Sequence, residues 1–269
     1  MKYTKFIDVM RNPLRYYFAG IQYVKSFALL KNRPIDNETY EILYESHAKA
    51  LRGSDAIGDG DFDLVGKIEL DLLKMEGLKP DHTLIDFGCG IGRLGIQVIP
   101  YLYDGTYVGI DISKSLLNRA GSFLESVTAQ SKCTVKLQHQ SSDVFKFESK
   151  SIDMICAFSV FTHMEHEDTF RYLKNALSIV KPGGKFILSC LPISSADSKK
   201  IFLLEAEHDL KHRWSRVRNV ITSKELITEI AVLAGWKVLH WYDGDKQNIG
   251  LPASEMKALG QSSCVLEAP

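Results

Sequence analysis

The chain has 269 residues, of which 45% are apolar and 25% are charged, and its 33 basic side chains balance 33 acidic ones. This composition is ordinary for a folded globular protein, and the zero net charge excludes a whole-molecule field that would attract nucleic acid. No apolar run approaches the roughly 18 residues of a membrane-spanning helix, and no signal peptide pattern is visible. We therefore expect a cytoplasmic protein without a nucleic-acid partner.

The first 61 residues predict an N-terminal helical extension or lid. Arg11, Arg15, Gln22 and Lys25 fall within about a quarter of a helical circumference, because a helix turns by about 100° per residue. Apolar and aromatic residues cover much of the remaining surface. This pattern is found on helices that lie on a membrane, and on helices that pack against their own domain or a second subunit. Peripheral membrane contact and dimerisation through this segment are therefore both open.

Residues 62–193 alternate between helical patterns and short apolar runs, which predicts parallel strands joined by helices. Helices are expected at 62–75, 93–102, 114–127 and 167–180, and strands at 83–87, 106–110, 134–138, 152–158 and 185–190. A charged stretch, 194–221, follows as an insertion. Residues 222–269 return to the core with a helix at 223–234 and strands at 236–242 and 263–266.

These elements predict an α/β fold with a doubly wound, mostly parallel sheet of seven strands, an N-terminal helical extension and a cap insertion. Ser113, Asp168 and Ser223 stand where a side chain can cap the start of a helix. In such sheets, ligands bind outside the carboxyl ends of the strands, at the point where the strand order reverses. The residues that follow each strand are therefore the candidates for function.

The glycine-rich run LIDFGCGIGR, residues 84–93, follows the first predicted strand. Glycines permit positive φ and let a ligand approach the backbone closely. Gly90-x-Gly92-x-x-Gly95 also matches the dinucleotide fingerprint, so an NAD-dependent oxidoreductase is one alternative. Asp86, which precedes the glycines, argues against that alternative, because a carboxylate there repels a pyrophosphate and favours a ligand with an ammonium group.

Acidic and polar residues also follow the next strands. Asp111 ends the second strand, where a carboxylate can accept hydrogen bonds from both hydroxyls of a ribose. Asp143 lies in the turn after the third strand, where its carboxylate can accept from an adenine amino group while the Val144 amide donates to the ring. The fourth strand ends at Phe158 and Ser159, and Lys-Pro-Gly-Gly at 181–184 is expected to turn the chain into the fifth.

The order of these motifs resembles the class I S-adenosylmethionine (SAM)-dependent methyltransferases over about residues 62–190. The motifs are Asp-x-Gly-x-Gly-x-Gly, the strand-end acid, Ser-Asp-Val, Asp-x-Ile-x-x-x-x-Ser and Lys-Pro-Gly-Gly. The last two strands fit the family's antiparallel sixth and seventh strands more loosely. The resemblance implies SAM as cofactor.

Transferred by position, the resemblance implies roles for twelve residues. The methionine part would be held by Asp86, Gly88, Gly90 and Gly92, with Cys89 and Arg93 in the same motif. The ribose would bind Asp111, and the adenine would contact Ile112, Asp143 and Val144. Phe158 and Ser159 would line the site near the sulfonium.

His163 is the first candidate for a catalytic base, because it follows the fourth strand in a loop that faces the reaction site in this family. A packing role that fixes the loop is the alternative. Arg213, Trp214, Arg216 and Arg218 in the insertion could bind an anionic or sugar substrate, or could be structural. His208 and His212 would share a helix face, where a solvated surface is favoured over a metal pair. Residues 240–243 either reach the substrate opening or only end their strand.

Five cysteines, Cys89, Cys133, Cys156, Cys190 and Cys264, are spread along the chain without a Cys-x-x-Cys pair. Four lie in apolar runs, which is typical of buried thiols. The spacing favours reduced thiols and no metal site.

The sequence therefore predicts a SAM-dependent methyltransferase acting on a small-molecule acceptor. A hydroxyl oxygen is favoured, on a sugar, a lipid-linked intermediate or a secondary metabolite, because a candidate histidine base and a polar cap are present. Methylation of nitrogen is the near alternative. A SAM-binding module without catalysis is a third, since the acceptor site has no recognisable motif.

Overall fold

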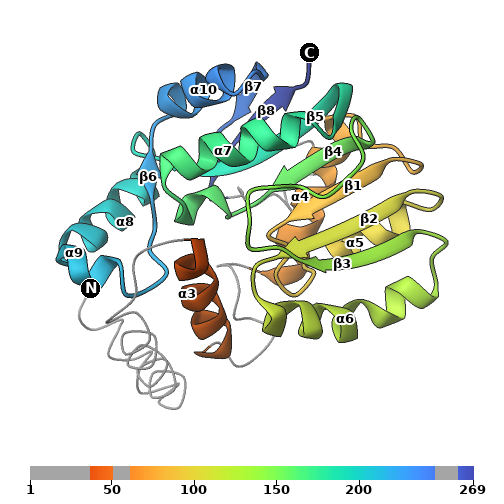
Figure 1. Cartoon of the computed structure of the whole chain (residues 1–269), viewed down its shortest axis with the longest axis horizontal. Helices are drawn as coiled ribbons and strands as arrows, with labels where there is room; N and C mark the ends of the chain where they lie inside the picture. The colour runs from red at the N-terminus through yellow and green to blue at the C-terminus, as the bar shows by residue number, and fades with distance from the viewer. Residues whose placement is uncertain (1–36, 51–60, 246–259) are drawn as a thin grey trace.

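The computed structural model describes residues 37–50, 61–245 and 260–269, and Figure 1 shows how they are arranged. The predicted amphipathic segment within residues 11–27 lies outside these ranges, so its membrane or subunit contacts stay a prediction. Among the helices that are described, none is long and apolar enough to cross a bilayer.

A single sheet forms the centre of the described chain. Its main path runs β3-β2-β1-β4-β5-β8-β7, so the strand order reverses between β1 and β4. The strands are β1 (Thr83–Phe87), β2 (Thr106–Asp111), β3 (Thr134–His139), β4 (Ile152–Ala157), β5 (Val180–Pro192), β7 (Lys237–Tyr242) and β8 (Ser262–Glu267). This is the predicted doubly wound sheet, and in sheets of this kind ligands bind at the reversal point, which here lies between β1 and β4.

At the far edge of the sheet, the last two predicted strands pair antiparallel with each other, as expected. β8 is antiparallel to β5, but β7 is antiparallel to β8 and therefore runs parallel to β5. Only β8 is thus reversed among the strands of the main path. An eighth strand, β6 (Ile221–Thr222), adds two residues beside the end of β5.

Helices cover both faces of the sheet. α4 (Phe62–Met75), α5 (Gly95–Tyr101) and α6 (Lys114–Ala129) bury residues such as Leu72, Ile99 and Leu124 against one face. α7 (His166–Leu177) and α10 (Lys224–Leu233) bury Leu173 and Ile227 against the other. Central parallel strands read as nearly continuous apolar runs because helices cover them on both sides.

Two of the three predicted caps form. The side chain of Ser113 accepts from Leu116 N at the start of α6, and that of Ser223 accepts from Leu226 N at the start of α10. Asp168 does not cap α7, because that helix begins earlier, at His166, and its N-cap residue is Glu165. Asp168 instead accepts a hydrogen bond from the Tyr40 hydroxyl at 2.8 Å.

β5 begins earlier than predicted. Lys-Pro-Gly-Gly lies inside the strand, where Gly183 has φ +74° and the register against β4 shifts between Ile152 and Met154. The glycines therefore form an irregularity within the strand, and the tight turn expected before it is absent from this part of the structure.

Three further helices lie near the carboxyl ends of the strands. α3 (Asn37–Ala50) packs against α6, and Figure 1 shows it beside the strand ends, apart from the two helical layers. The predicted insertion contains α8 (Ala196–Ala206) and α9 (Leu210–Arg213). All five cysteines are buried and free, as their apolar surroundings predicted.

Candidate functional site

The glycine turn after β1 has the backbone that only glycine adopts easily. Gly88, Gly90 and Gly92 have φ values of +81°, +57° and +91°. The amides of Gly88 and Cys89 both donate to Ile110 O, at 2.7 and 3.0 Å. A Cβ atom on Gly88 would lie 2.3 Å from Val160 Cγ2. The turn is therefore tied to β2 and pressed against the segment that follows β4.

Asp111 connects this turn to the start of α6. Its Oδ2 accepts from Gly90 N and its Oδ1 accepts from Ser113 N, both at 2.8 Å. Burial raises the pKa of this carboxyl, while the backbone hydrogen bonds oppose that rise. Because each carboxylate oxygen can accept more than one hydrogen bond, Asp111 can still bind hydroxyl groups of a ligand.

Asp86 faces the protein interior. Its Oδ2 accepts from the Tyr107 hydroxyl at 2.8 Å, and its Oδ1 lies 3.8 Å from Cys156 Sγ. Burial raises its pKa to about 7, and the neighbouring Glu69 adds to the rise. The oxygens of Asp86 already bind protein groups. Asp86 would therefore act on a ligand in the turn through its buried charge or dipole.

Arg93 and Cys89, which belong to the same motif, also face the interior. The Arg93 guanidinium binds both oxygens of buried Glu69, at 2.5 and 3.3 Å. Burial nevertheless raises the pKa of Glu69. Cys89 is buried, with its thiol 3.8 Å from Gly90 O. Both side chains support the turn from within.

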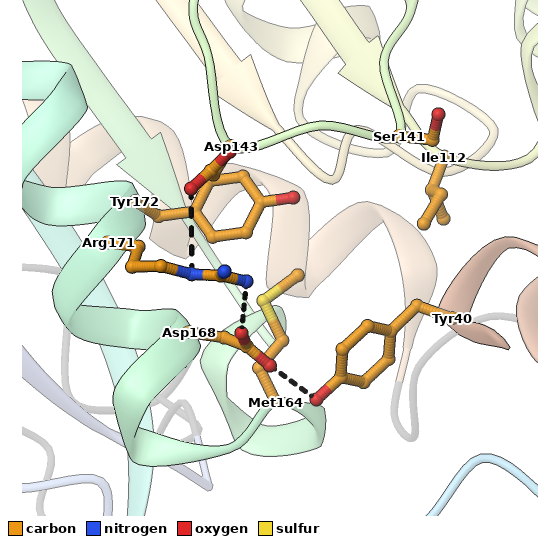
Figure 2. A pocket seen from close by; sticks show the side chains of 8 residues that line it. All are labelled: Tyr40, Ile112, Ser141, Asp143, Met164, Asp168, Arg171 and Tyr172. Carbon is orange, nitrogen blue, oxygen red and sulfur yellow. Dashed lines mark hydrogen bonds and ion pairs between the residues drawn. The ribbon is translucent and has the colours of Figure 1, made fainter. Parts of the chain in front are cut away.

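A small, open hollow lies between the ends of β2 and β3 and the start of α7. Figure 2 shows the side chains that line it: Tyr40, Ile112, Ser141, Asp143, Met164, Asp168, Arg171 and Tyr172. Ile112 and Met164 supply apolar surface, while Asp143 and Ser141 supply acceptors at one edge. A flat heteroaromatic base with an amino group suits this combination of surfaces.

Charged groups form a chain along the rim of this hollow, and dashed lines mark it in Figure 2. Arg171 lies 2.6 Å from Asp168 Oδ1 and 3.5 Å from Asp143 Oδ2. Asn175 Nδ2 donates to the backbone oxygen of Asp143 at 2.9 Å, which fixes the turn. The Val144 side chain is exposed, so the prediction for this residue concerns its amide alone.

Residues of α3 complete the site, and the sequence reasoning missed them. The Tyr40 hydroxyl donates to Asp168 and accepts from Glu165 N at 3.2 Å. Glu45 accepts from Ser113 Oγ and Ser115 N at the start of α6. Burial acts to raise the pKa of Glu45, but the hydrogen bonds from Ser113 and Ser115 lower it to about 2. The sequence held one sign of this helix face: identical residues recur four positions apart, Tyr40 with Tyr44 and Glu41 with Glu45, and residues with that spacing lie on the same side of a helix.

His163 ends a 3₁₀ turn, Phe161–His163, and faces α3. Its Nδ1 lies 2.8 Å from Arg218 O, and the Tyr44 ring meets it edge-on at 5.9 Å. A carbonyl oxygen only accepts, so Nδ1 carries the proton and Nε2 carries the lone pair. Burial lowers the pKa of His163, which favours the neutral ring. The side chain is therefore a neutral imidazole with a basic nitrogen.

The segment after β4 holds the other two predicted residues. Phe158 is half-buried against the core beneath α4 and α5. Ser159 has φ +60°, and its amide donates to Ser189 Oγ at 2.7 Å. Both lie beside Val160, which touches the glycine turn.

The arginines of the insertion bind protein groups. Arg216 pairs with Glu205 at 2.6 Å, and Arg218 pairs with Glu165. Arg213 donates to His208 O at 2.8 Å. The insertion is thereby fixed to the segment after β4, and the expectation that these arginines bind an anionic substrate is not supported by their contacts.

The remaining candidates are also engaged in structural contacts. His240 and the Tyr242 hydroxyl bind Glu76 at 2.8 and 2.6 Å, and Trp241 donates to Thr228 at 3.3 Å. His208 and His212 stack with ring centroids 4.1 Å apart. Within residues 37–50, 61–245 and 260–269, no group of three or more His, Cys, Asp or Glu side chains is placed to hold a metal ion.

Comparison with known proteins identifies the core. Residues 85–186 match the model of a family described as a methyltransferase domain. A ubiquinone biosynthesis O-methyltransferase of Coxiella burnetii is 27% identical over 129 residues, which are 48% of this chain and 51% of that protein. A hydroxymycolate synthase of Mycobacterium tuberculosis is 28% identical over 119 residues, 44% of this chain and 37% of that protein. The chain spans about half the length, or less, of these curated relatives.

Solved structures share the fold. Magnesium protoporphyrin IX methyltransferase from Synechocystis, with bound SAM, matches with a TM-score of 0.59 and 16% identity over 88% of this chain and all of that chain. Geranyl diphosphate C-methyltransferase from Streptomyces coelicolor matches with a TM-score of 0.54 and 12% identity, over 76% of this chain and 78% of that one. The glycine turn, the strand order and the family match agree: residues 85–186 are similar to a methyltransferase domain, and the chain has the fold of these solved methyltransferases.

Proposed function

We propose that the protein binds SAM at the carboxyl ends of β1, β2 and β3 and transfers its methyl group to a hydroxyl oxygen of a small molecule. The family match over residues 85–186 supports the reaction class. The observation that carries the site is the alignment of the glycine turn, Asp111 and the hollow beside Ile112 along one edge of the sheet.

The described residues fit the parts of SAM. Asp111 would accept from the ribose hydroxyls, and Ile112 would contact the adenine while Asp143 and the Val144 amide meet its polar edge. The turn at Gly88, Gly90 and Gly92 would hold the amino-acid end, with Asp86 as the buried charge that favours an ammonium group. SAM, when bound, supplies an electrophilic methyl group on a sulfonium.

Methyl transfer to an alcohol needs a base, and we assign that role to His163. Its neutral ring has the proton fixed on Nδ1 by Arg218 O, so Nε2 can take the proton of an acceptor hydroxyl. Holding the acceptor oxygen in line with the methyl group, about 3 Å away, supplies much of the remaining acceleration. The insertion at 194–221 and α3 would cover the acceptor and the cofactor.

Thermal melting of the chain with SAM, S-adenosylhomocysteine, NAD and NADP tests the cofactor. A ligand at 100 times its dissociation constant adds about 2.7 kcal/mol, or roughly 5–10 °C for a domain of this size. We expect stabilisation by SAM and S-adenosylhomocysteine alone. Stabilisation by NAD or NADP alone would overturn the proposal in favour of an oxidoreductase.

Turnover separates an enzyme from a binding module. The protein would be incubated with methyl-labelled SAM and panels of phenols, aliphatic alcohols and amines, and the products identified by mass spectrometry. Label on a hydroxyl oxygen supports the proposal. Label on nitrogen only would move the acceptor assignment to amines and remove the need for His163 as a base.

A further inference from the structure

Ser159, Ser189 and Gln261 form a closed ring of hydrogen bonds, although they come from three separate parts of the chain. The amide of Ser159 donates to Ser189 Oγ at 2.7 Å, and Ser189 Oγ donates to Gln261 Oε1 at 2.6 Å. Gln261 Nε2 then donates to Ser159 Oγ at 2.8 Å. Every bond runs in the same direction around the ring, which defines the orientation of the Gln261 amide.

The ring encloses a strained residue. Ser159 has φ +60°, a left-handed conformation that a residue with a side chain adopts rarely and keeps only where its surroundings enforce it. Both the amide and the hydroxyl of Ser159 belong to the ring. The bonds to Ser189 and Gln261 are therefore the contacts that hold this backbone conformation.

The strained residue is coupled to the glycine turn through its neighbour. Val160 Cγ2 lies 2.3 Å from the position that a Cβ atom on Gly88 would take, so the two residues are in close contact. A change of φ at Ser159 would move Val160 relative to Gly88. The ring thus influences the turn that the proposed function assigns to the amino-acid end of the cofactor.

Gln261 itself is fixed where the chain leaves β7 and returns to β8, because Gly244 pairs there with Gly260 and Ser262. Gly260 N donates to Gly244 O at 2.8 Å, and Gly244 N donates to Ser262 Oγ at 3.2 Å. A Cβ atom on Gly244 would lie 2.2 Å from the Gln261 backbone carbon. The backbone on both sides of Gln261 is therefore held, and its side-chain amide reaches Ser159 from the residue just before β8.

We infer that Gln261 and Ser189 are positioning residues for the amino-acid end of the cofactor. They hold Ser159 in the left-handed conformation, which keeps Val160 against Gly88 and keeps the glycine turn in its binding form. This inference rests on the proposed function, because it presumes that the turn binds that end of SAM. It assigns a cofactor-positioning role to a residue far outside the segment that matches the methyltransferase family.

Calorimetric titration of the full chain with two ligands tests the inference. S-Adenosylhomocysteine carries the amino-acid end, and 5′-methylthioadenosine has the same nucleoside without it. For Gln261→Leu we expect S-adenosylhomocysteine to bind about tenfold more weakly, the effect of roughly 1.4 kcal/mol of backbone relaxation. Binding of 5′-methylthioadenosine should change by less than about twofold.

A second substitution distinguishes positioning from general damage. Glycine adopts positive φ without strain, so adding Ser159→Gly to Gln261→Leu should restore S-adenosylhomocysteine binding to within about threefold of wild type. Ser263→Ala is the matched control, because it removes a hydroxyl of the same strand, β8, that forms no hydrogen bond in the described structure, and it should bind both ligands as wild type does. Circular dichroism and melting confirm that each variant is folded.

The outcomes are distinct. Unchanged binding in Gln261→Leu, equal weakening of both ligands, or no recovery in the double variant would each overturn the inference. Failure of the wild-type protein to bind S-adenosylhomocysteine would instead overturn the proposed function.

Discussion

Asp86 carries a carboxyl group whose surroundings oppose its charge. It is buried, and burial raises its pKa to about 7, against an ordinary value of 3.8. In the free protein, the Tyr107 hydroxyl donates a hydrogen bond to this buried carboxyl group. The proposed site would place the cationic end of SAM near it. A buried acid of this kind lowers the stability of the empty protein in exchange for ligand binding.

Asp86→Asn tests whether the buried carboxyl group lowers the stability of the ligand-free protein. Between about pH 4 and pH 7 the folded wild-type protein holds a proton that the unfolded chain has lost, so its free energy of unfolding falls as pH rises through this window. Asparagine has no such proton. Urea unfolding from pH 5 to 8 should show the variant gaining stability relative to wild type, on the order of a few kcal/mol at pH 8.

The control for this comparison is Asp104→Asn, which changes an exposed carboxyl in the loop before β2. Its stability should follow the wild-type curve. Parallel curves for Asp86→Asn and wild type would show that Asp86 is already charged in the folded protein. The same variant should bind S-adenosylhomocysteine more weakly, because the buried negative charge is lost.

His163 provides a second prediction at the residue scale. In His163→Asn, the new amide can still donate to Arg218 O, but the basic Nε2 is gone. We expect S-adenosylhomocysteine affinity within about threefold of wild type and a loss of kcat of about 10²- to 10⁴-fold on a hydroxyl acceptor. Burial lowers the pKa of His163, so the acidic limb of the wild-type pH profile should lie below pH 6.5. Unchanged kcat would assign His163 to packing alone.

At the scale of elements, α3 contributes Tyr40 to the lining of the hollow beside Ile112. Tyr40 links this helix to α7 through Asp168, and Glu45 links it to the start of α6. These contacts join a helix before the glycine turn to two helices after it. The site is therefore built by packing between elements as well as by the strand ends.

Tyr40→Phe tests this contribution. The substitution removes the hydrogen bond to Asp168 and keeps the aromatic ring. The free energy of ligand binding should therefore weaken by about 1 kcal/mol, which raises the dissociation constant roughly fivefold. Because the proposed site places the nucleoside beside α3, the binding of S-adenosylhomocysteine and of 5′-methylthioadenosine should weaken equally. Tyr103→Phe, an exposed tyrosine in the loop before β2, serves as the control. Weakening of S-adenosylhomocysteine alone would place Tyr40 at the amino-acid end instead.

The elements of the core were predictable because they depend on local patterns. The helix at 62–75 and the strand at 83–87 begin and end where their apolar periodicity and their flanking polar residues indicated. The roles of Asp168 and Arg218 were not predictable in this way. Each binds a residue more than 50 positions away, and only the packed fold brings those pairs together.

At the scale of the whole molecule, Glu76 joins three distant parts of the chain. It lies at the end of α4 and binds Lys185 of β5 together with His240 and Tyr242 of β7. Burial acts to raise its pKa, but these three hydrogen bonds lower it. The carboxylate therefore ties the first helical layer to the far edge of the sheet.

Glu76→Gln should destabilise the fold without changing the cofactor site. Removing the charge leaves Lys185 with a weaker partner in a partly buried place, so we expect a loss of about 1–3 kcal/mol in urea unfolding at pH 7. Because the folded pKa is depressed, the stabilisation is present above the ordinary value of 4.5 and is lost below it as pH falls. The difference between variant and wild type should therefore shrink in acid, while S-adenosylhomocysteine affinity stays unchanged at pH 7.

The position of β8 also bears on how the protein is made. This strand comes last in chain order, yet it lies between β5 and β7 and forms hydrogen bonds with both. A nascent chain that has emerged through β7 has two open strand edges facing one gap, and open edges are sites of pairing with other chains. Until residues 262–267 leave the ribosome, both edges of that gap stay unpaired. Closure of the sheet therefore waits for residues 262–267, and a chain interrupted before them would keep an open gap between β5 and β7.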